Sequence, residues 1–183
     1  MKVQGNGQAR VLTGDEIQRL FAHGLSSDRD RALFGLCLYT GCRISEALTL
    51  RVDDLQGDTL TLRRRHTKGK LQTRSLHIHP ALAELLAAYA PASGYLFPGM
   101  PGRSPHLTRF SADKILRAAC RRVGLQGIST HSFRRTALTT MSNAGVPLRH
   151  IQDISGHRSL ATLQRYLEVR PEDRQRAIAT LQF

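Results

Sequence analysis

The sequence has no long hydrophobic run and few acidic residues, and both scarcities exclude classes of protein. No apolar stretch approaches the roughly 20 residues that a membrane-spanning helix requires. Residues 1–10, MKVQGNGQAR, lack the apolar middle of a signal peptide, so we expect a cytoplasmic protein that does not bind membranes. Hydrophobic residues make up 40% of the 183, which fits a single globular domain and not a disordered chain.

Cysteine is also scarce. Cys37, Cys42 and Cys120 are scattered and form no CxxC pair, which argues against a disulfide framework and against a zinc site. We expect them to be reduced, small core residues. The sequence also lacks a phosphate-binding loop and a cluster of acidic metal ligands. We therefore expect neither a cofactor nor a metal ion.

The scarcity of acidic residues leaves a strong positive charge. Lys and Arg total 27 against 14 Asp and Glu, which gives a formal net charge of +13. A surplus of this size favours a polyanionic partner, most commonly nucleic acid. The alternative is a basic but merely well-solvated surface, and charge alone does not separate DNA from RNA.

Helical periodicity covers most of the chain. Thr13, followed three residues later by Glu16, is a capping box that predicts the start of a helix. Another predicted helix has Thr130 as N-cap and Gly145 as the C′ residue. Further helices are predicted over about 28–39, 43–50, 80–89, 108–123 and 147–156, from Ser159 through Tyr166, and from Pro171 onward.

Residues 59–78 change from a helical to an alternating period. Leu60 and Leu62, then Leu76 and Ile78, alternate with polar residues as half-buried strands do. The charged stretch RRRHTKGKLQTR between them predicts the tip of an antiparallel hairpin. The expected fold is therefore mainly α with a small antiparallel β-sheet (α+β), in one domain.

The segment HSFRR carries the first candidate functional pair. His131 and Arg134 are three residues apart, so they share a face in the first turn of a predicted helix. The free N–H groups of that turn and the helix dipole attract anions, and the Arg fork matches two phosphate oxygens. Most His-x-x-Arg pairs are nevertheless ordinary surface residues.

The segment GHRSLATLQRY carries the second pair. His157 and Tyr166 are nine residues apart, or 2.5 helical turns, and would point to opposite sides of one straight helix. Gly156 and the capping residue Ser159 predict a break that brings both to one site. The alternative is that both are core residues on separate helices.

Two further cations stand in distinctive places. Arg43, in TGCRISEALTL, follows a Gly-containing break among apolar neighbours, and Glu46 one turn later is placed to orient its guanidinium. A buried Arg needs such a partner, so the pair is alternatively only structural. Lys68 lies at the predicted hairpin tip, where a solvated turn lysine is the ordinary interpretation.

The joint order and spacing of these motifs resemble the catalytic domain of tyrosine recombinases, the class that includes Xer-type resolvases and phage integrases. The resemblance covers about residues 12–181. It implies a DNA strand transesterification in which Tyr166 attacks a phosphodiester and forms a 3′-phosphotyrosyl bond. The other implied catalytic residues are Arg43, Lys68, His131, Arg134 and His157, with Glu46 in support.

The resemblance also implies roles for each group. Arg43, Arg134 and His157 would bind the phosphate, His131 would take the tyrosine proton, and Lys68 would protonate the leaving 5′-oxygen. Lys70 lies two residues from Lys68 and is the alternative catalytic lysine. Five basic residues are expected to contact DNA: Arg63, Arg64, Arg65, Lys70 and Arg135.

The expected partners are double-stranded DNA and other copies of the chain. Recombination between two duplexes implies a homotetramer on DNA. The terminal stripe of Ala177, Ile178 and Leu181 would dock on a neighbouring protomer or pack on its own domain. Residues 1–183 are expected to form a single catalytic domain without the N-terminal DNA-clamp domain of most relatives, as a fragment or as a natural short recombinase.

Two other functions remain open from the sequence. A type IB topoisomerase uses Arg, Lys, His and Tyr to nick and religate one strand, although the TGCRISEAL and GHRSLATLQRY segments favour a recombinase. The second alternative is a DNA-binding protein that has this fold but does not recombine DNA by itself. The target DNA sequence, and the choice between integration, excision, inversion and resolution, are not encoded in these motifs.

Overall fold

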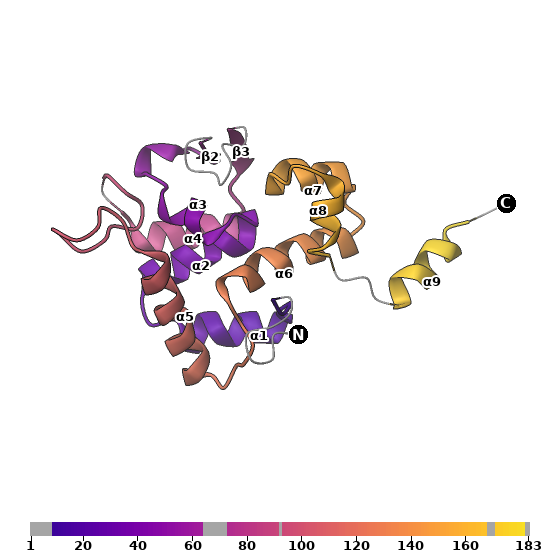
Figure 1. Cartoon of the computed structure of the whole chain (residues 1–183), viewed down its shortest axis with the longest axis horizontal. Helices are drawn as coiled ribbons and strands as arrows, with labels where there is room; N and C mark the ends of the chain where they lie inside the picture. The colour runs from indigo at the N-terminus through magenta and orange to yellow at the C-terminus, as the bar shows by residue number, and fades with distance from the viewer. Residues whose placement is uncertain (1–8, 64–72, 92, 168–170, 182–183) are drawn as a thin grey trace.

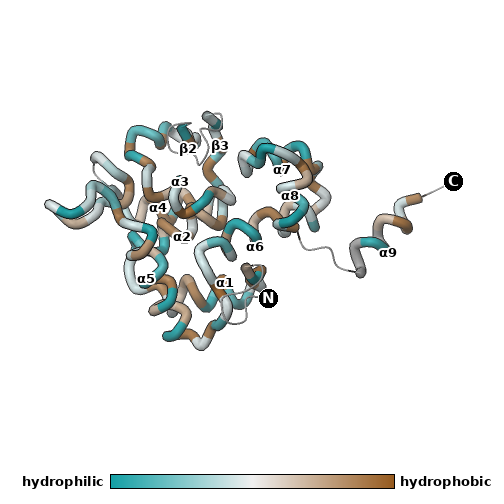
Figure 2. Tube along the Cα trace, in the orientation of Figure 1, coloured by the Kyte–Doolittle hydropathy of each residue, from teal (hydrophilic) through white to brown (hydrophobic). Residues whose placement is uncertain are grey.

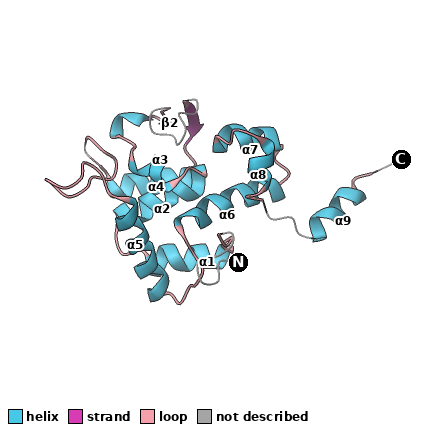
Figure 3. Cartoon of the chain, in the orientation of Figure 1, coloured by secondary structure: helices cyan, strands magenta, loops and turns pink. Residues whose placement is uncertain are grey.

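The structure is a computed structural model that describes residues 9–63, 73–91, 93–167 and 171–181. Helices dominate it, and a small sheet lies at one side (Figures 1 and 3). This arrangement confirms the predicted fold class. The helices are α1 Gly14–Arg19, α2 Asp28–Thr40, α3 Ile44–Leu48, α4 Pro80–Tyr89, α5 Arg109–Arg122, α6 Thr130–Asn143, α7 Leu148–Ser155, α8 Leu160–Gln164 and α9 Pro171–Ala179.

Side-chain caps begin several of these helices. The predicted capping box before α1 is confirmed, because Thr13 and Glu16 each accept a hydrogen bond from the other's backbone N–H. Ser159 caps α8 as predicted. The N-cap of α6 is Ser129 and not Thr130, which is the first helical residue, so the predicted start was one residue late.

Three other helix boundaries differ from the prediction. The helix expected over 43–50 is shorter, since α3 covers Ile44–Leu48 and Arg43 is its N-cap. A π-helical turn, Leu20–Gly24, follows α1 without a break. Tyr166 does not lie on α8, as we expected, but two residues beyond its last residue, Gln164.

The sheet has three antiparallel strands in the order β1 (Leu55–Gln56), β2 (Thr59–Leu62) and β3 (Arg74–His77). The predicted hairpin corresponds to β2 and β3, whose register pairs Leu60 with Leu76. The sequence did not reveal β1, which has only two residues. Of the predicted tip, residues 63–74, the part 64–72 lies outside the described residues, and Arg74 belongs to β3 instead.

Two hydrophobic clusters hold the helices together. The main core is built on α2, which packs against α4 and α6, and the ring of Phe34 stacks on Phe133 with centroids 5.1 Å apart. Cys37, Cys42 and Cys120 are buried there as free thiols, as predicted. The smaller cluster has three buried residues in the described part of the chain: Leu138, Ile151 and Leu163.

The helix α6 links the two clusters. It runs from the main body of the domain toward α7 and α8, which lie together at its far end (Figure 1). In the same view α9 stands apart from these helices, and it carries both hydrophobic and hydrophilic residues (Figure 2). Among the described helices, none has the length and apolar character that crossing a membrane would require.

Candidate active site

Arg43 and Glu46 form the first part of a polar cluster at the start of α3. Gly41 adopts a left-handed conformation (φ 61°) that ends α2 and turns the chain into α3. The Glu46 carboxylate then accepts from the Arg43 backbone N–H at 2.9 Å and from Nη1 of its guanidinium at 3.1 Å. The structure therefore gives Glu46 the geometry we predicted, in which it holds the Arg43 guanidinium.

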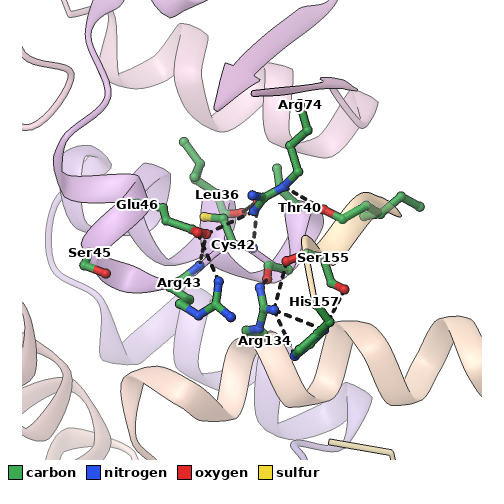
Figure 4. Close-up of polar contacts among 12 residues, drawn as sticks. Leu36, Thr40, Cys42, Arg43, Ser45, Glu46, Arg74, Arg134, Ser155 and His157 are labelled. Carbon is green, nitrogen blue, oxygen red and sulfur yellow. Dashed lines mark hydrogen bonds and ion pairs between the residues drawn. The ribbon is translucent and has the colours of Figure 1, made fainter. Parts of the chain in front are cut away.

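Arg74 is a second cation on the same carboxylate, and sequence reasoning missed it. From β3, its Nη2 donates to Oε2 of Glu46 at 3.0 Å (Figure 4). Burial alone would raise the pKa of Glu46, but Arg74 and Arg43 more than offset this effect and lower it below the usual value. Glu46, whose side chain is wholly buried, is thus a carboxylate at neutral pH.

Arg134 lies at the centre of the cluster. It is buried on α6, where Nη1 donates to the carbonyl of Gly41 and Nη2 donates to the carbonyl of Ser155 at 2.9 Å. Burial and the nearby Arg43 lower the pKa of Arg134 to about 10, so the guanidinium still carries its charge at neutral pH. One cation therefore joins the end of α2 to the end of α7.

His157 follows the left-handed Gly156 that ends α7. Its ring nitrogens lie 3.1 Å (Nε2) from Nη2 of Arg134 and 2.7 Å (Nδ1) from Oγ of Ser155. Because a guanidinium only donates, the ring must present an unprotonated nitrogen to Arg134. Burial and the adjacent Arg134 lower the pKa of His157 to about 3, so the imidazole is neutral.

Tyr166 meets these residues from the turn after α8. Its ring centroid lies 4.9 Å from that of His157, and the guanidinium carbon of Arg134 lies 5.6 Å from the Tyr166 ring. The Thr139 hydroxyl on α6 donates to the Tyr166 carbonyl at 3.3 Å. The break between α7 and α8 therefore brings His157 and Tyr166 to one place, as the sequence predicted.

His131 occupies the first turn of α6 and is exposed, one turn before Arg134. The predicted catalytic Lys68 lies outside the described residues, as do three of the predicted DNA contacts, Arg64, Arg65 and Lys70.

The two described residues among the predicted DNA contacts bind protein groups in this structure. Arg63 pairs with the buried Asp54, and Arg135 donates to the carbonyl of Ala9 at 2.7 Å. Neither bond tests a contact with DNA, which remains a prediction for both residues.

A pattern in the sequence could have indicated Arg74. Along β3, Arg74 and Leu76 lie on one face, and Ser75 and His77 lie on the other. Because Leu76 faces the core, the Arg74 side chain also points toward it. We had assigned Arg74 to the solvated basic stretch of the hairpin. An Arg in register with a core residue is expected to point inward and to need a buried polar partner.

The chemistry of the cluster suits a phosphate. Arg43 and Arg134 are cations, His157 is a neutral hydrogen-bonding group, and Tyr166 is a potential nucleophile beside them. Within the described residues, no group of three or more His, Cys, Asp or Glu side chains is placed to hold a metal ion. Such a set of donors is typical of enzymes that transfer phosphoryl groups through a covalent intermediate.

The comparisons with known proteins agree with this class. The model of the phage integrase family matches residues 10–173, nearly the whole chain, and the chain belongs to that family. The chain is 38% identical to the tyrosine recombinase XerC of Rhodospirillum centenum over 154 aligned residues. This alignment covers 79% of this chain and 43% of the relative. The chain spans between 43% and 64% of the length of the first three curated relatives it matches.

Two solved structures share the fold. The integrase of mycobacterium phage Brujita superposes with a TM-score of 0.71 at 30% identity, over 94% of this chain and 57% of that one. The XerA recombinase superposes with a TM-score of 0.79 at 22% identity, over 97% of this chain and 68% of that one. The predicted tyrosine-recombinase catalytic-domain fold is therefore confirmed.

Proposed function

We propose that this chain is the catalytic domain of a site-specific recombinase, which cleaves and rejoins DNA strands through a 3′-phosphotyrosyl intermediate. Its relatives named tyrosine recombinase and integrase support this function. The single observation that carries it is the convergence of Arg134, His157 and Tyr166, which come from three separate segments. The Arg134 guanidinium lies 3.1 Å (Nη2) from Nε2 of His157, and its carbon lies 5.6 Å from the Tyr166 ring centroid.

Phosphate binding falls to the two arginines and His157. Attack on a phosphodiester adds negative charge to the non-bridging oxygens, and preorganised cations stabilise that charge most strongly. The Arg43 guanidinium, fixed by Glu46, and the Arg134 guanidinium supply two positive charges. His157, whose ring lies 3.1 Å from the Arg134 guanidinium, would turn an N–H toward the phosphate and donate a further hydrogen bond.

The Tyr166 ring must move for this step. Arg134 is only 1% exposed, and the Tyr166 ring lies over its guanidinium. We propose that binding of DNA turns the ring off Arg134, so that the phosphate takes its place and the phenol oxygen faces phosphorus. The small hydrophobic cluster around Tyr166 makes such a local movement less costly than a change in the main core.

Two proton transfers complete the reaction. Tyr166 forms the new O–P bond and loses its proton to His131, which stands exposed in the first turn of α6. The bond from phosphorus to the 5′-oxygen breaks, and Lys68 protonates that oxygen. Attack by another strand's 5′-hydroxyl reverses both steps, so that the energy of the phosphodiester is conserved.

The proposed partners are double-stranded DNA and three further copies of the chain. The net charge of +13 supports a salt-sensitive attraction to the phosphate backbone. Ile178 and Leu181 at the C-terminal end are 70% and 59% exposed, which favours docking on a neighbouring protomer over packing on their own domain. Since DNA is the proposed substrate, we propose that the protein acts in the cytoplasm.

Covalent capture tests the proposal without knowledge of the target site. The probe is a pool of duplexes with a nick close to a randomised segment, so that cleavage releases a short fragment and traps the enzyme. Wild type and Tyr166→Phe are incubated with the pool and separated by denaturing electrophoresis. We expect an adduct only with wild type, and its DNA, once sequenced, identifies the preferred site.

Other outcomes would point to the alternatives. Adducts without sequence preference, together with relaxation of supercoiled DNA, would favour a type IB topoisomerase. A wild type that is folded and binds DNA but forms no adduct would favour a binding protein. An adduct that survives Tyr166→Phe would contradict the mechanism.

A further inference from the structure

The Arg74 guanidinium contacts two separate segments of the active site. Its Nη2 binds Glu46 at the start of α3, and its Nε donates to the carbonyl of Ile154 in the last turn of α7 at 2.9 Å. These groups are 28 and 80 residues from Arg74 in the sequence. Figure 4 shows the side chain reaching from β3 into the space between the two helices.

The carboxylate of Glu46 requires more positive charge than Arg43 alone supplies. It is wholly buried, and a buried carboxylate with a single shared cation is costly. Arg74, whose side chain is 9% exposed, provides the second ion pair. The charge of Arg43, whose side chain is 21% exposed, is therefore not entirely neutralised by Glu46 and stays available to a phosphate.

Gly156 fits the same arrangement. A Cβ atom at this position would lie 2.7 Å from Nη1 of Arg74, and φ is already +65°. Glycine thus allows the turn before His157 to rest directly on the guanidinium. Nη1 is buried there and has no hydrogen-bond partner among the described residues, so close packing and the other two bonds determine its place.

We infer that Arg74 is a positioning residue for the proposed reaction. It binds Glu46, which orients Arg43, and it binds the end of α7, which carries the Gly156–His157 turn. Through these two contacts it sets the distance between the Arg43 guanidinium and the His157 ring. The inference rests on the proposed function, in which both groups bind the same phosphate.

Arg74→Lys tests this role, because lysine keeps the charge but cannot bind Glu46 and the Ile154 carbonyl through a planar fork. The matched control is Arg149→Lys on α7, where Arg149 forms an exposed pair with Asp153. Single-turnover cleavage is measured at saturating concentrations of a captured duplex. We expect Arg74→Lys to cleave on the order of tenfold to a hundredfold more slowly than wild type. The control should stay within about twofold of wild type.

A second substrate separates positioning from a general structural defect. A methylphosphonate at the cleaved position has a methyl group in place of one charged oxygen, so its cleavage depends less on the cations. If Arg74 acts by placing Arg43 and His157, most of the deficit of Arg74→Lys disappears on this substrate. An equal deficit on both substrates, or no deficit on either, would overturn the inference.

The ring signals of His157 in the DNA-free protein provide a test that does not depend on activity. We expect nuclear magnetic resonance to show a changed His157 ring environment in Arg74→Lys and an unchanged one in Arg149→Lys. Arg74→Gln, which lacks the charge, should show the same change if the lysine variant does not fold. Unchanged His157 signals in a folded variant would overturn the inference, whereas absence of a wild-type adduct would contradict only the proposed function.

Discussion

The two hydrophobic clusters differ in size, and each holds a different half of the candidate site. The main core extends through α2 to α6 and fixes Arg43 and Glu46. The smaller cluster has three buried residues in the described part of the chain, and Tyr166 packs on its edge. Since buried apolar area is the main stabilising contribution, the half with Arg43 and Glu46 is held more firmly than the half with Tyr166.

This difference has a mechanistic consequence. A phosphate-binding site gains from rigidity, because preorganised charges need no rearrangement during the reaction. In the proposed mechanism Tyr166, whose ring lies over Arg134 in the free protein, must instead move before it attacks. Arg134 stands at the boundary and is tied to both halves, through the carbonyls of Gly41 and Ser155.

Removing a side chain from the main core should have the largest effect. Phe133 is wholly buried and stacks on Phe34, so Phe133→Ala should lower the free energy of unfolding by about 3–5 kcal/mol. Chemical denaturation followed by circular dichroism measures this loss. A loss below about 1 kcal/mol would show that α6 is not anchored in the main core.

The equivalent change in the smaller cluster should act more locally. Leu163→Ala should cost about 2–3 kcal/mol, near the lower end for a buried leucine, because the few neighbours can collapse around the gap. Hydrogen exchange should accelerate in α7 and α8 but remain slow in α2. Equal acceleration in α2 would mean that the two clusters unfold as one unit.

Acid should weaken the folded protein through His157. The native ring stays neutral down to a pKa of about 3, whereas an unfolded histidine binds a proton below about pH 6.5. Between these values the unfolded state binds more protons, so stability falls as the pH falls. From pH 7 to pH 5 this single group should remove roughly 2 kcal/mol.

The His157→Gln variant isolates that contribution. Its free energy of unfolding should depend less steeply on pH between 7 and 5 than that of the wild type, whatever its absolute stability. Urea denaturation at several pH values gives both slopes. Identical slopes would show that His157 titrates normally in the folded protein.

The smallest effect is expected at the C-terminal end. Ile178 on α9 is 70% exposed, so Ile178→Ser should change the free energy of unfolding by less than about 0.5 kcal/mol. If α9 docks on a neighbouring protomer, the same change should weaken assembly on DNA. Urea denaturation measures the first effect, and sedimentation with and without DNA measures the second. An unchanged assembly would refute a role for Ile178 in it.

Local signals explain why much of the fold could be predicted from the sequence. The capping box of Thr13 and Glu16 and the cap at Ser159 each report on one helix start through bonds within a few residues. The start of α6 was predicted one residue late because Ser129 and Thr130 are both suited to cap a helix. Strand β1 was missed because two residues are too few for an alternating pattern.

The site was only partly predictable for a physical reason. Arg43, Arg134, His157 and Tyr166 stand in short motifs whose order in the sequence points to one chemistry. The alternation along β3 could have shown that Arg74 points inward, but not that it meets Glu46 and Ile154, which are distant in sequence. The contact with Ile154 depends on how β3 packs against α7, which only the tertiary structure reveals.

The central claim is that Tyr166 forms the covalent bond to DNA. The direct measurement is mass spectrometry of the captured adduct after digestion with nuclease and trypsin. Trypsin releases residues 166–174, in which Tyr166 is the only hydroxyl-bearing residue, so a nucleotide on this peptide identifies its site. We predict a peptide with Tyr166 linked to a 3′-phosphoryl nucleotide. A nucleotide carried by a peptide without Tyr166 would contradict the mechanism.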